Sequence, residues 1–131
     1  MADQSYADDL TIADDAALWR LIHPTWAVVD ENRGGLRVSS AAFENSPDGS
    51  PTSILIAEAV FTTRRGPEDV VHEGYGLASL TAGQARQCGQ AVARDPLPNE
   101  PAHGLLVGPK TKSIRKRLAA AAAWVISLPN N

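Results

Sequence analysis

The stretch HGLLVGPKTKSIRKRLAAAAAWVI, residues 103–126, decides the fold that the sequence predicts. It opens with an apolar run typical of a short strand, His103–Val107, and continues through a loop of glycine, proline and lysine. Ser113 is suited to cap a helix. Apolar residues then recur in steps of four and three, as on one face of a helix: Ile114, Leu118, Ala121, Val125 and Leu128. We therefore expect a strand, a basic loop and a long C-terminal helix that stops at Pro129.

Short apolar segments separated by turns precede this stretch. Thr25–Asp30 and Leu36–Phe43 favour strands, and the turn residues of Glu31–Gly35 predict a hairpin between them. Farther on, a strand should pass into a helix over Ala57–Arg65, which a Gly-Pro pair would end. Thr81 then follows another strand and is suited to cap a helix of small residues.

Together these segments predict one small α+β domain. We expect a mixed sheet of roughly four to five short strands with two to three packed helices. A right-handed crossover through the helix that begins at Thr81 would make part of the sheet parallel. The domain should span residues 14–131, after a flexible acidic arm at residues 1–13.

Composition excludes several classes of protein. The chain has 131 residues, the usual size of one domain, and a formal net charge of −3, whereas dedicated nucleic-acid binders usually carry a basic excess. Its single cysteine, Cys88, cannot form an internal disulfide. The acidic N-terminus is unlike a signal peptide, and the apolar run Leu118–Ile126 is far shorter than the roughly 20 residues of a membrane span. We expect a cytoplasmic protein without membrane association or a dedicated DNA-binding motif.

The basic start of the predicted last helix is the first candidate site. After Glu100 the chain has no acidic residue, and a basic cluster follows within eight positions: Lys110, Lys112, Arg115, Lys116 and Arg117. Cations at a helix N-terminus oppose the helix dipole, which favours anions there. A strand, a loop and a helix N-terminus can bring backbone N–H groups, lysines and hydroxyls together around an anion. The candidate anion-binding residues are Lys110, Thr111, Lys112, Ser113 and Arg115. The ligand would be a phosphate-containing molecule or an acidic partner; alternatively, the charges are a solvated run that balances the acidic arm.

Polar residues inside otherwise apolar segments form a second set of candidates. Buried polar groups need hydrogen-bond partners, so such positions are either internally bonded or open to a ligand. Alternatively, the serines and alanines are small only to let a helix pack closely. The residues of this set are Arg20, His23, Arg37, Ser39 and Ser40.

The histidines complete the list of candidates, with His72 and His103 beside His23. No two of them have the spacing of metal ligands, so we predict neither a metal site nor a cofactor. The paired aspartates of residues 8–9 and 14–15 lie in or beside a predicted mobile arm, which would not position them.

The segments RVSSAAF, SILIAEA, EGYGLASLTAG, RDPLPNEPAHGLLVGPKT and LAAAAAWV resemble those of a family of small uncharacterised bacterial proteins. The resemblance covers about residues 17–126 and implies a bacterial, single-domain protein, without implying an activity. Separately, Arg20, Ser39–Ser40 and Glu58 or Glu73 resemble the Arg…Ser-x-Ser…Glu order of the ADP-ribosyltransferase fold. That resemblance implies that Arg20 and Ser39 hold NAD and that Glu58 assists the transfer.

Two functions are therefore expected from the sequence. The first is a non-enzymatic accessory or binding module that acts with a protein or anionic partner through the basic start of its last helix. The second is a small enzyme that uses NAD or a nucleotide, with Arg20, Ser39 and Glu58 as catalytic residues.

Overall fold

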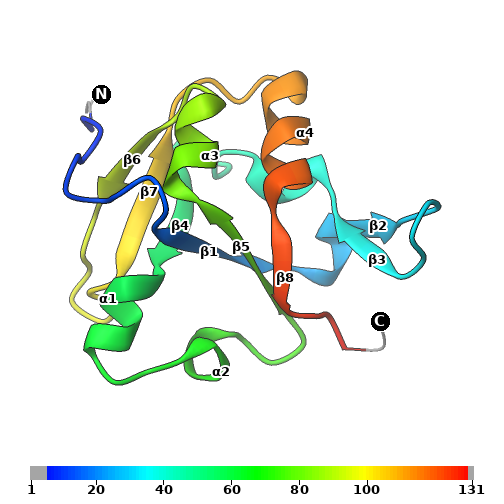
Figure 1. Cartoon of the computed structure of the whole chain (residues 1–131), viewed down its shortest axis with the longest axis horizontal. Helices are drawn as coiled ribbons and strands as arrows, with labels where there is room; N and C mark the ends of the chain where they lie inside the picture. Colours follow the sequence, from blue (N-terminus) through cyan, green and yellow to red (C-terminus); the bar gives the residue numbers. More distant parts are fainter. Residues whose placement is uncertain (1–5, 130–131) are drawn as a thin grey trace.

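The computed structural model of the chain describes residues 6–129 (Figure 1). Eight strands, four α-helices and two short 3-10 helices follow one another along these residues. In chain order they are β1 Ala17–Ile22, η1 Pro24–Trp26, β2 Ala27–Val29, β3 Leu36–Val38, η2 Ser40–Phe43, β4 Thr52–Ile56, α1 Ala57–Thr62, α2 Pro67–Val70, β5 Gly76–Thr81, α3 Ala82–Gln87, β6 Ala91–Arg94, β7 His103–Val107, α4 Lys112–Ala121 and β8 Ala123–Ile126.

Six strands form one sheet in the order β6-β7-β4-β1-β5-β8, and β2 pairs with β3 in a separate hairpin. The predictions of an α+β fold and of this hairpin are confirmed, but the strand predicted over Leu36–Phe43 ends at Val38, and its second half is the 3-10 helix η2. The sheet is larger than expected, and the predicted parallel part is wrong because all neighbouring strands in it pair antiparallel. The chain does pass through α3 from β5 to the other side of the sheet. There β6 pairs antiparallel with β7 and forms the edge farthest from β8.

The predicted long C-terminal helix is also wrong. Helix α4 ends at Ala121, and Ala122 takes an extended conformation with φ −79° and ψ 135°. The next residues include Trp124, Val125 and Ile126, which favour strands, and they pair with β5 as β8. The indole Nε1 of Trp124 donates a hydrogen bond to the carbonyl of Leu36 at 2.9 Å, which ties β8 to the hairpin. With α4 this short, no helix within residues 6–129 is long and apolar enough to cross a membrane.

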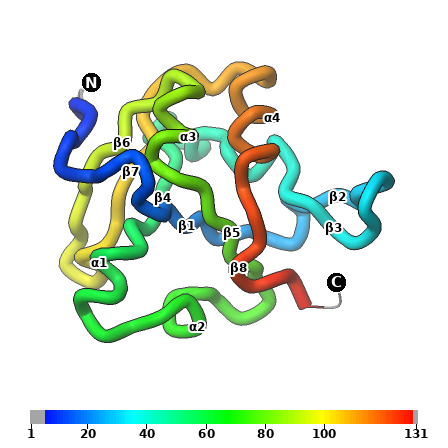
Figure 2. The backbone as a smooth tube through the Cα atoms, in the orientation of Figure 1, coloured from blue at the N-terminus to red at the C-terminus, as the bar shows by residue number. Residues whose placement is uncertain are grey.

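The helices cover both faces of the sheet, as Figure 2 lets the reader follow. Because side chains alternate along a strand, Leu18 of β1 packs with α3 and α4, through Ala85 and Leu118. Trp19 points to the opposite face and packs with α1 and α2, through Val60 and Val70. The sheet therefore separates the core into two layers, with α3 and α4 packed on one face and α1 and α2 on the other.

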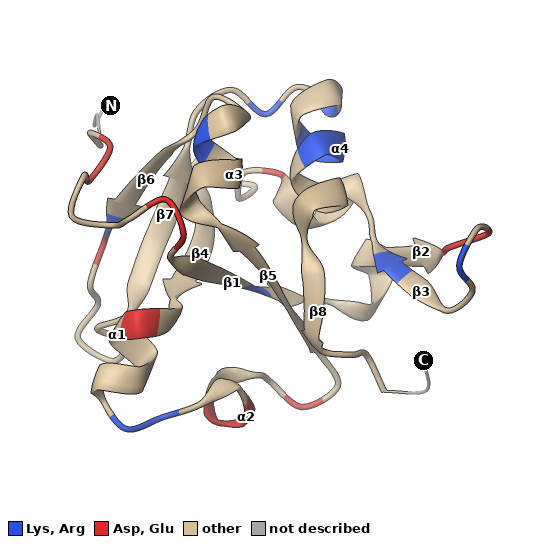
Figure 3. Ribbon diagram, in the orientation of Figure 1, with Lys and Arg blue, Asp and Glu red and all other residues tan. Residues whose placement is uncertain are grey.

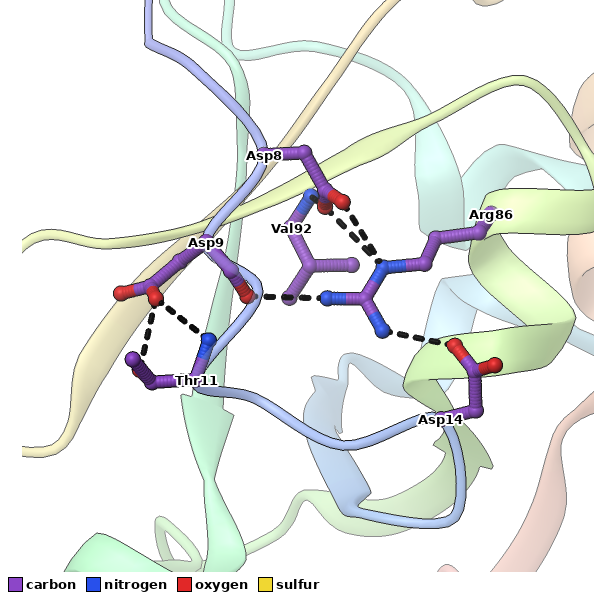
Figure 4. Close-up of polar contacts among 6 residues, drawn as sticks. All are labelled: Asp8, Asp9, Thr11, Asp14, Arg86 and Val92. Carbon is purple, nitrogen blue, oxygen red and sulfur yellow. Dashed lines mark hydrogen bonds and ion pairs between the residues drawn. The ribbon is translucent and has the colours of Figure 1, made fainter.

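The N-terminal segment that precedes β1 lies against α3 and β6 (Figure 4). The guanidinium of Arg86 contacts the carboxylates of Asp8 at 3.0 Å and Asp14 at 2.7 Å. The backbone N–H of Asp9 donates to the carbonyl of Val92 at 2.8 Å, and the N–H of Val92 donates to Asp8. These contacts hold the carboxylates of Asp8 and Asp14 in place, whereas the sequence led us to expect a mobile arm that would not position them. Residues 1–5 of the predicted arm lie outside the described residues.

Candidate functional site

A groove lies between the β2–β3 hairpin and the end of α4 with β8. It encloses about 800 Å³, within the range of ligand-binding cavities. Four of its lining residues were singled out from sequence, either as candidates or as part of the basic cluster: Arg37, Ser39, Ser40 and Lys116. Small and apolar side chains form much of the surface between them, among them Leu36, Val38, Ala119, Ala120 and Trp124.

The groove carries more positive than negative charge. Arg33, Arg37 and Lys116 are exposed and make no ion pair within residues 6–129. Asp30 is the single carboxylate among the described lining residues, and it accepts hydrogen bonds from the backbone N–H groups of Asn32 and Arg33. Figure 3 shows basic positions on both β3 and α4, the two elements on either side of the groove. An anionic group would be attracted to this surface.

Two serine hydroxyls stand in the same groove with their hydrogen-bonding capacity unused. Neither Ser39 nor Ser40 makes a side-chain hydrogen bond among the described residues, although both are half-buried. The backbone N–H of Ser39 donates to the carbonyl of Trp26 at 2.8 Å, which fixes the start of η2. A hydroxyl can donate to a carboxylate or phosphate oxygen, so these serines complement the nearby cations.

Arg20 holds the segment that presents these serines. Its Nε donates to the carbonyl of Ala42 at 2.8 Å and its Nη1 to the carbonyl of Ser53 at 2.9 Å, while the guanidinium stacks 5.0 Å from the Trp26 ring centre. Burial lowers the pKa of Arg20 to about 10. Thr52 Oγ1 donates to the carbonyls at the other end of η2. Arg20 is thus engaged with backbone groups, and its structural role is to hold η2 against the sheet.

Most of the basic residues around the start of α4 bind carbonyl oxygens. Lys110 Nζ donates to the carbonyl of Leu106 at 2.9 Å and to that of Gly108, and its pKa is lowered to about 8 by burial and by the charge of Arg20. Arg115 Nε donates to the carbonyl of Lys110, and its Nη1 contacts Glu44 at 3.3 Å. These cations satisfy backbone groups that a strand end and a loop leave without partners.

Four further residues in the first turns of α4 differ in their roles. Thr111 caps α4, because its Oγ1 accepts from the N–H of Ile114 at 3.2 Å; the prediction that Ser113 is the cap is wrong. Ser113 and Lys112 are exposed at the first turn. Lys116, one turn farther along the helix, lines the groove.

The residues proposed from the ADP-ribosyltransferase resemblance do not gather in one place. Arg20 lies on the sheet face covered by α3 and α4, where it reaches η2. Ser39 lies at the groove beside η2. Glu58 is exposed in the first turn of α1, the helix whose Val60 packs on the opposite face.

Two of the three histidines, His23 and His72, contact the same tyrosine, whereas His103 lies elsewhere, on the sheet. His23 accepts the N–H of Thr25 at its Nδ1 and stacks edge-on with Tyr75, which also contacts the exposed ring of His72. His103 lies between Ser53 and Asp95 on the sheet. Within residues 6–129 no three histidine, cysteine, aspartate or glutamate side chains are placed to hold a metal ion.

Sequence reasoning missed Ser53, Asp95 and Arg33. Ser53 is a small polar residue inside the apolar strand TSILI, a weak signal on its own, and Asp95 stands only at the turn after β6. Their proximity to His103 depends on strand register, which a single sequence does not specify. Arg33 lies in the hairpin turn, where exposed cations are common.

Comparison of the chain with protein-family models, with curated protein sequences and with solved structures finds no match.

Proposed function

We propose that this protein is a binding module that holds an extended acidic segment of a partner protein in the groove between the β2–β3 hairpin and α4–β8. The observation that carries the proposal is the positive charge of Arg33, Arg37 and Lys116 around one cavity, because none of the three is ion-paired within residues 6–129. A partner with carboxylates spaced along an extended chain complements such a surface, and electrostatic complementarity raises the association rate and the specificity.

The position of β8 favours an extended partner. The opposite edge of the sheet, β6, is covered by the N-terminal segment through the hydrogen bonds between Asp9 and Val92 and between Val92 and Asp8. Within the described residues, no strand lies beyond β8, which forms part of the groove wall. An exposed sheet edge can accept a partner's strand. Alternating acidic and apolar residues would then meet the cations on one side and the alanines and Trp124 on the other.

The proposal is tested with a short fluorescein-labelled peptide in which Glu and Val alternate, followed by fluorescence anisotropy. We expect binding that weakens as salt is raised, because salt screens charges at this exposed surface. Lys116→Glu should weaken it about tenfold, the effect of losing one attractive contact and adding a repulsive one.

Lys112→Glu is the matched control, since it makes the same charge change on the same helix outside the groove. It should leave the affinity nearly unchanged. If Lys112→Glu and Lys116→Glu weaken binding equally, the anion-binding surface is the start of α4 instead. The proposal is wrong if the peptide does not bind, or if a peptide in which Lys and Val alternate binds with the same affinity.

A further inference from the structure

On the sheet face opposite α3 and α4, a serine, a histidine and an aspartate lie in contact with one another. In the strand register, Leu55 of β4 pairs with His103 of β7, and Ser53 lies two residues before Leu55 on the same face. The N–H of Asp95, just after β6, donates to the carbonyl of His103 at 2.9 Å. The three polar side chains therefore come from three neighbouring strands, away from the groove.

The contacts of His103 indicate which ring nitrogen carries the hydrogen in the neutral imidazole. Its Nδ1 lies 3.0 Å from the backbone carbonyl oxygen of Asp95 and 3.1 Å from the Asp95 carboxylate. Both are acceptors, so Nδ1 carries the hydrogen. In the neutral ring Nε2 then has a free lone pair, and Ser53 Oγ lies 3.1 Å from it. Ser53 consequently donates its hydroxyl hydrogen to His103, the arrangement of a serine nucleophile and its general base.

The immediate surroundings restrict what can reach the hydroxyl. Ser53 and His103 are half-buried, and the His103 side chain retains 15% of its exposure. Ser53 pairs in register with Leu105 and is followed on its face by Leu55, and both of these larger side chains are buried. A small acyl group fits beside such neighbours better than a long one.

We propose that Ser53 is a nucleophile toward esters of short carboxylic acids, with His103 as its general base and Asp95 as a positioning residue. Ser53 Oγ forms a bond to the ester carbonyl carbon while its proton passes to His103 Nε2. The bond from that carbon to the alcohol oxygen then breaks, and the alcohol leaves with the proton from Nε2. Water, giving a proton to Nε2, attacks the acyl-serine; the carboxylic acid leaves and the proton returns to Ser53. This activity is independent of the function proposed for the groove.

The test uses the full chain and p-nitrophenyl acetate. We expect release of p-nitrophenol and an acetyl group that mass spectrometry maps to Ser53. Ser53→Ala and His103→Gln should each lower the rate about 100-fold, the lower range of general-base effects. For Asp95→Asn we expect a lower kcat with an unchanged KM, partly restored in Asp95→Glu.

Ser79→Ala is the matched control. Ser79 lies on the same sheet face, where it pairs with Trp19, and is half-buried without a histidine partner among the described residues. It should leave the rate unchanged. Acetylation confined to other residues, or a wild-type rate no higher than that of the heat-unfolded chain, would overturn the proposal; mapping the adduct on the wild-type protein needs no variant to fold.

Discussion

Arg20 is the residue of β1 whose side chain reaches the 3-10 helix η2. A polar residue in an apolar strand is a reasonable candidate for a ligand contact, and the ADP-ribosyltransferase resemblance gave it a role in holding NAD. In the structure its guanidinium binds the carbonyls of Ala42 and Ser53 and stacks on Trp26. The same contacts place η2, and with it Ser39, at the groove.

Arg20→Met should therefore lower the free energy of unfolding. The change keeps the length of the side chain but leaves two carbonyls, those of Ala42 and Ser53, without these donors. We expect a loss of about 2 to 4 kcal/mol in urea denaturation, the sum of two unsatisfied acceptors. Arg33→Met, at an exposed position of the hairpin turn, serves as the control and should change stability little. Equal stability of the two variants would contradict the role assigned to Arg20.

Among the helices and strands, those marked by turn residues or by a capping residue could be predicted from the sequence. The turn residues of Glu31–Gly35 predicted the hairpin, and Thr81 caps α3 with the reciprocal contact of Gln84. The alanine-rich end was misjudged because alanine favours a helix while the following Trp-Val-Ile favours a strand, and only pairing with β5 decides between them. Gly76 of β5 leaves room for this pairing, since a Cβ there would lie 2.8 Å from the Trp124 ring.

The cap of α4 gives a sharp prediction at this scale. Thr111→Ala should lower the free energy of unfolding by about 1 kcal/mol, the usual value of a lost N-cap, because the N–H of Ile114 loses its acceptor. Ser113→Ala, the residue expected from the sequence to be the cap, should be close to neutral. Thermal denaturation of both variants decides which residue caps the helix, and a larger effect of Ser113→Ala would contradict the structure.

In the whole molecule, the order of the strands in the sheet could not be predicted from a single sequence. Register brings together residues far apart in the chain, as with Ser53 and His103, and tertiary packing places the hairpin opposite α4. The sequence did identify Arg37, Ser39 and Ser40 as polar residues that require an explanation, and the structure places all three at one groove. Lys116 was visible only as a member of a basic run, since the side of α4 that meets the hairpin depends on packing.

The N-terminal segment contributes to the stability of the whole domain through Arg86. Asp8→Ala removes one ion pair and the acceptor for the N–H of Val92. We expect a loss of about 1 to 2 kcal/mol, together with faster hydrogen exchange at the Val92 amide. Asp15→Ala, an exposed neighbour with no ion pair within residues 6–129, should change neither quantity. Unchanged exchange at Val92 in the Asp8 variant would show that the segment is not held through this contact.

Titration of the ¹⁵N-labelled protein with the Glu-Val peptide shows whether the groove binds an acidic segment. We expect backbone amide resonances to shift at Leu36–Ser40 and at Lys116–Trp124, on the two walls of the groove. Shifts confined to Lys110–Arg115, or spread evenly over the surface, would contradict binding in the groove.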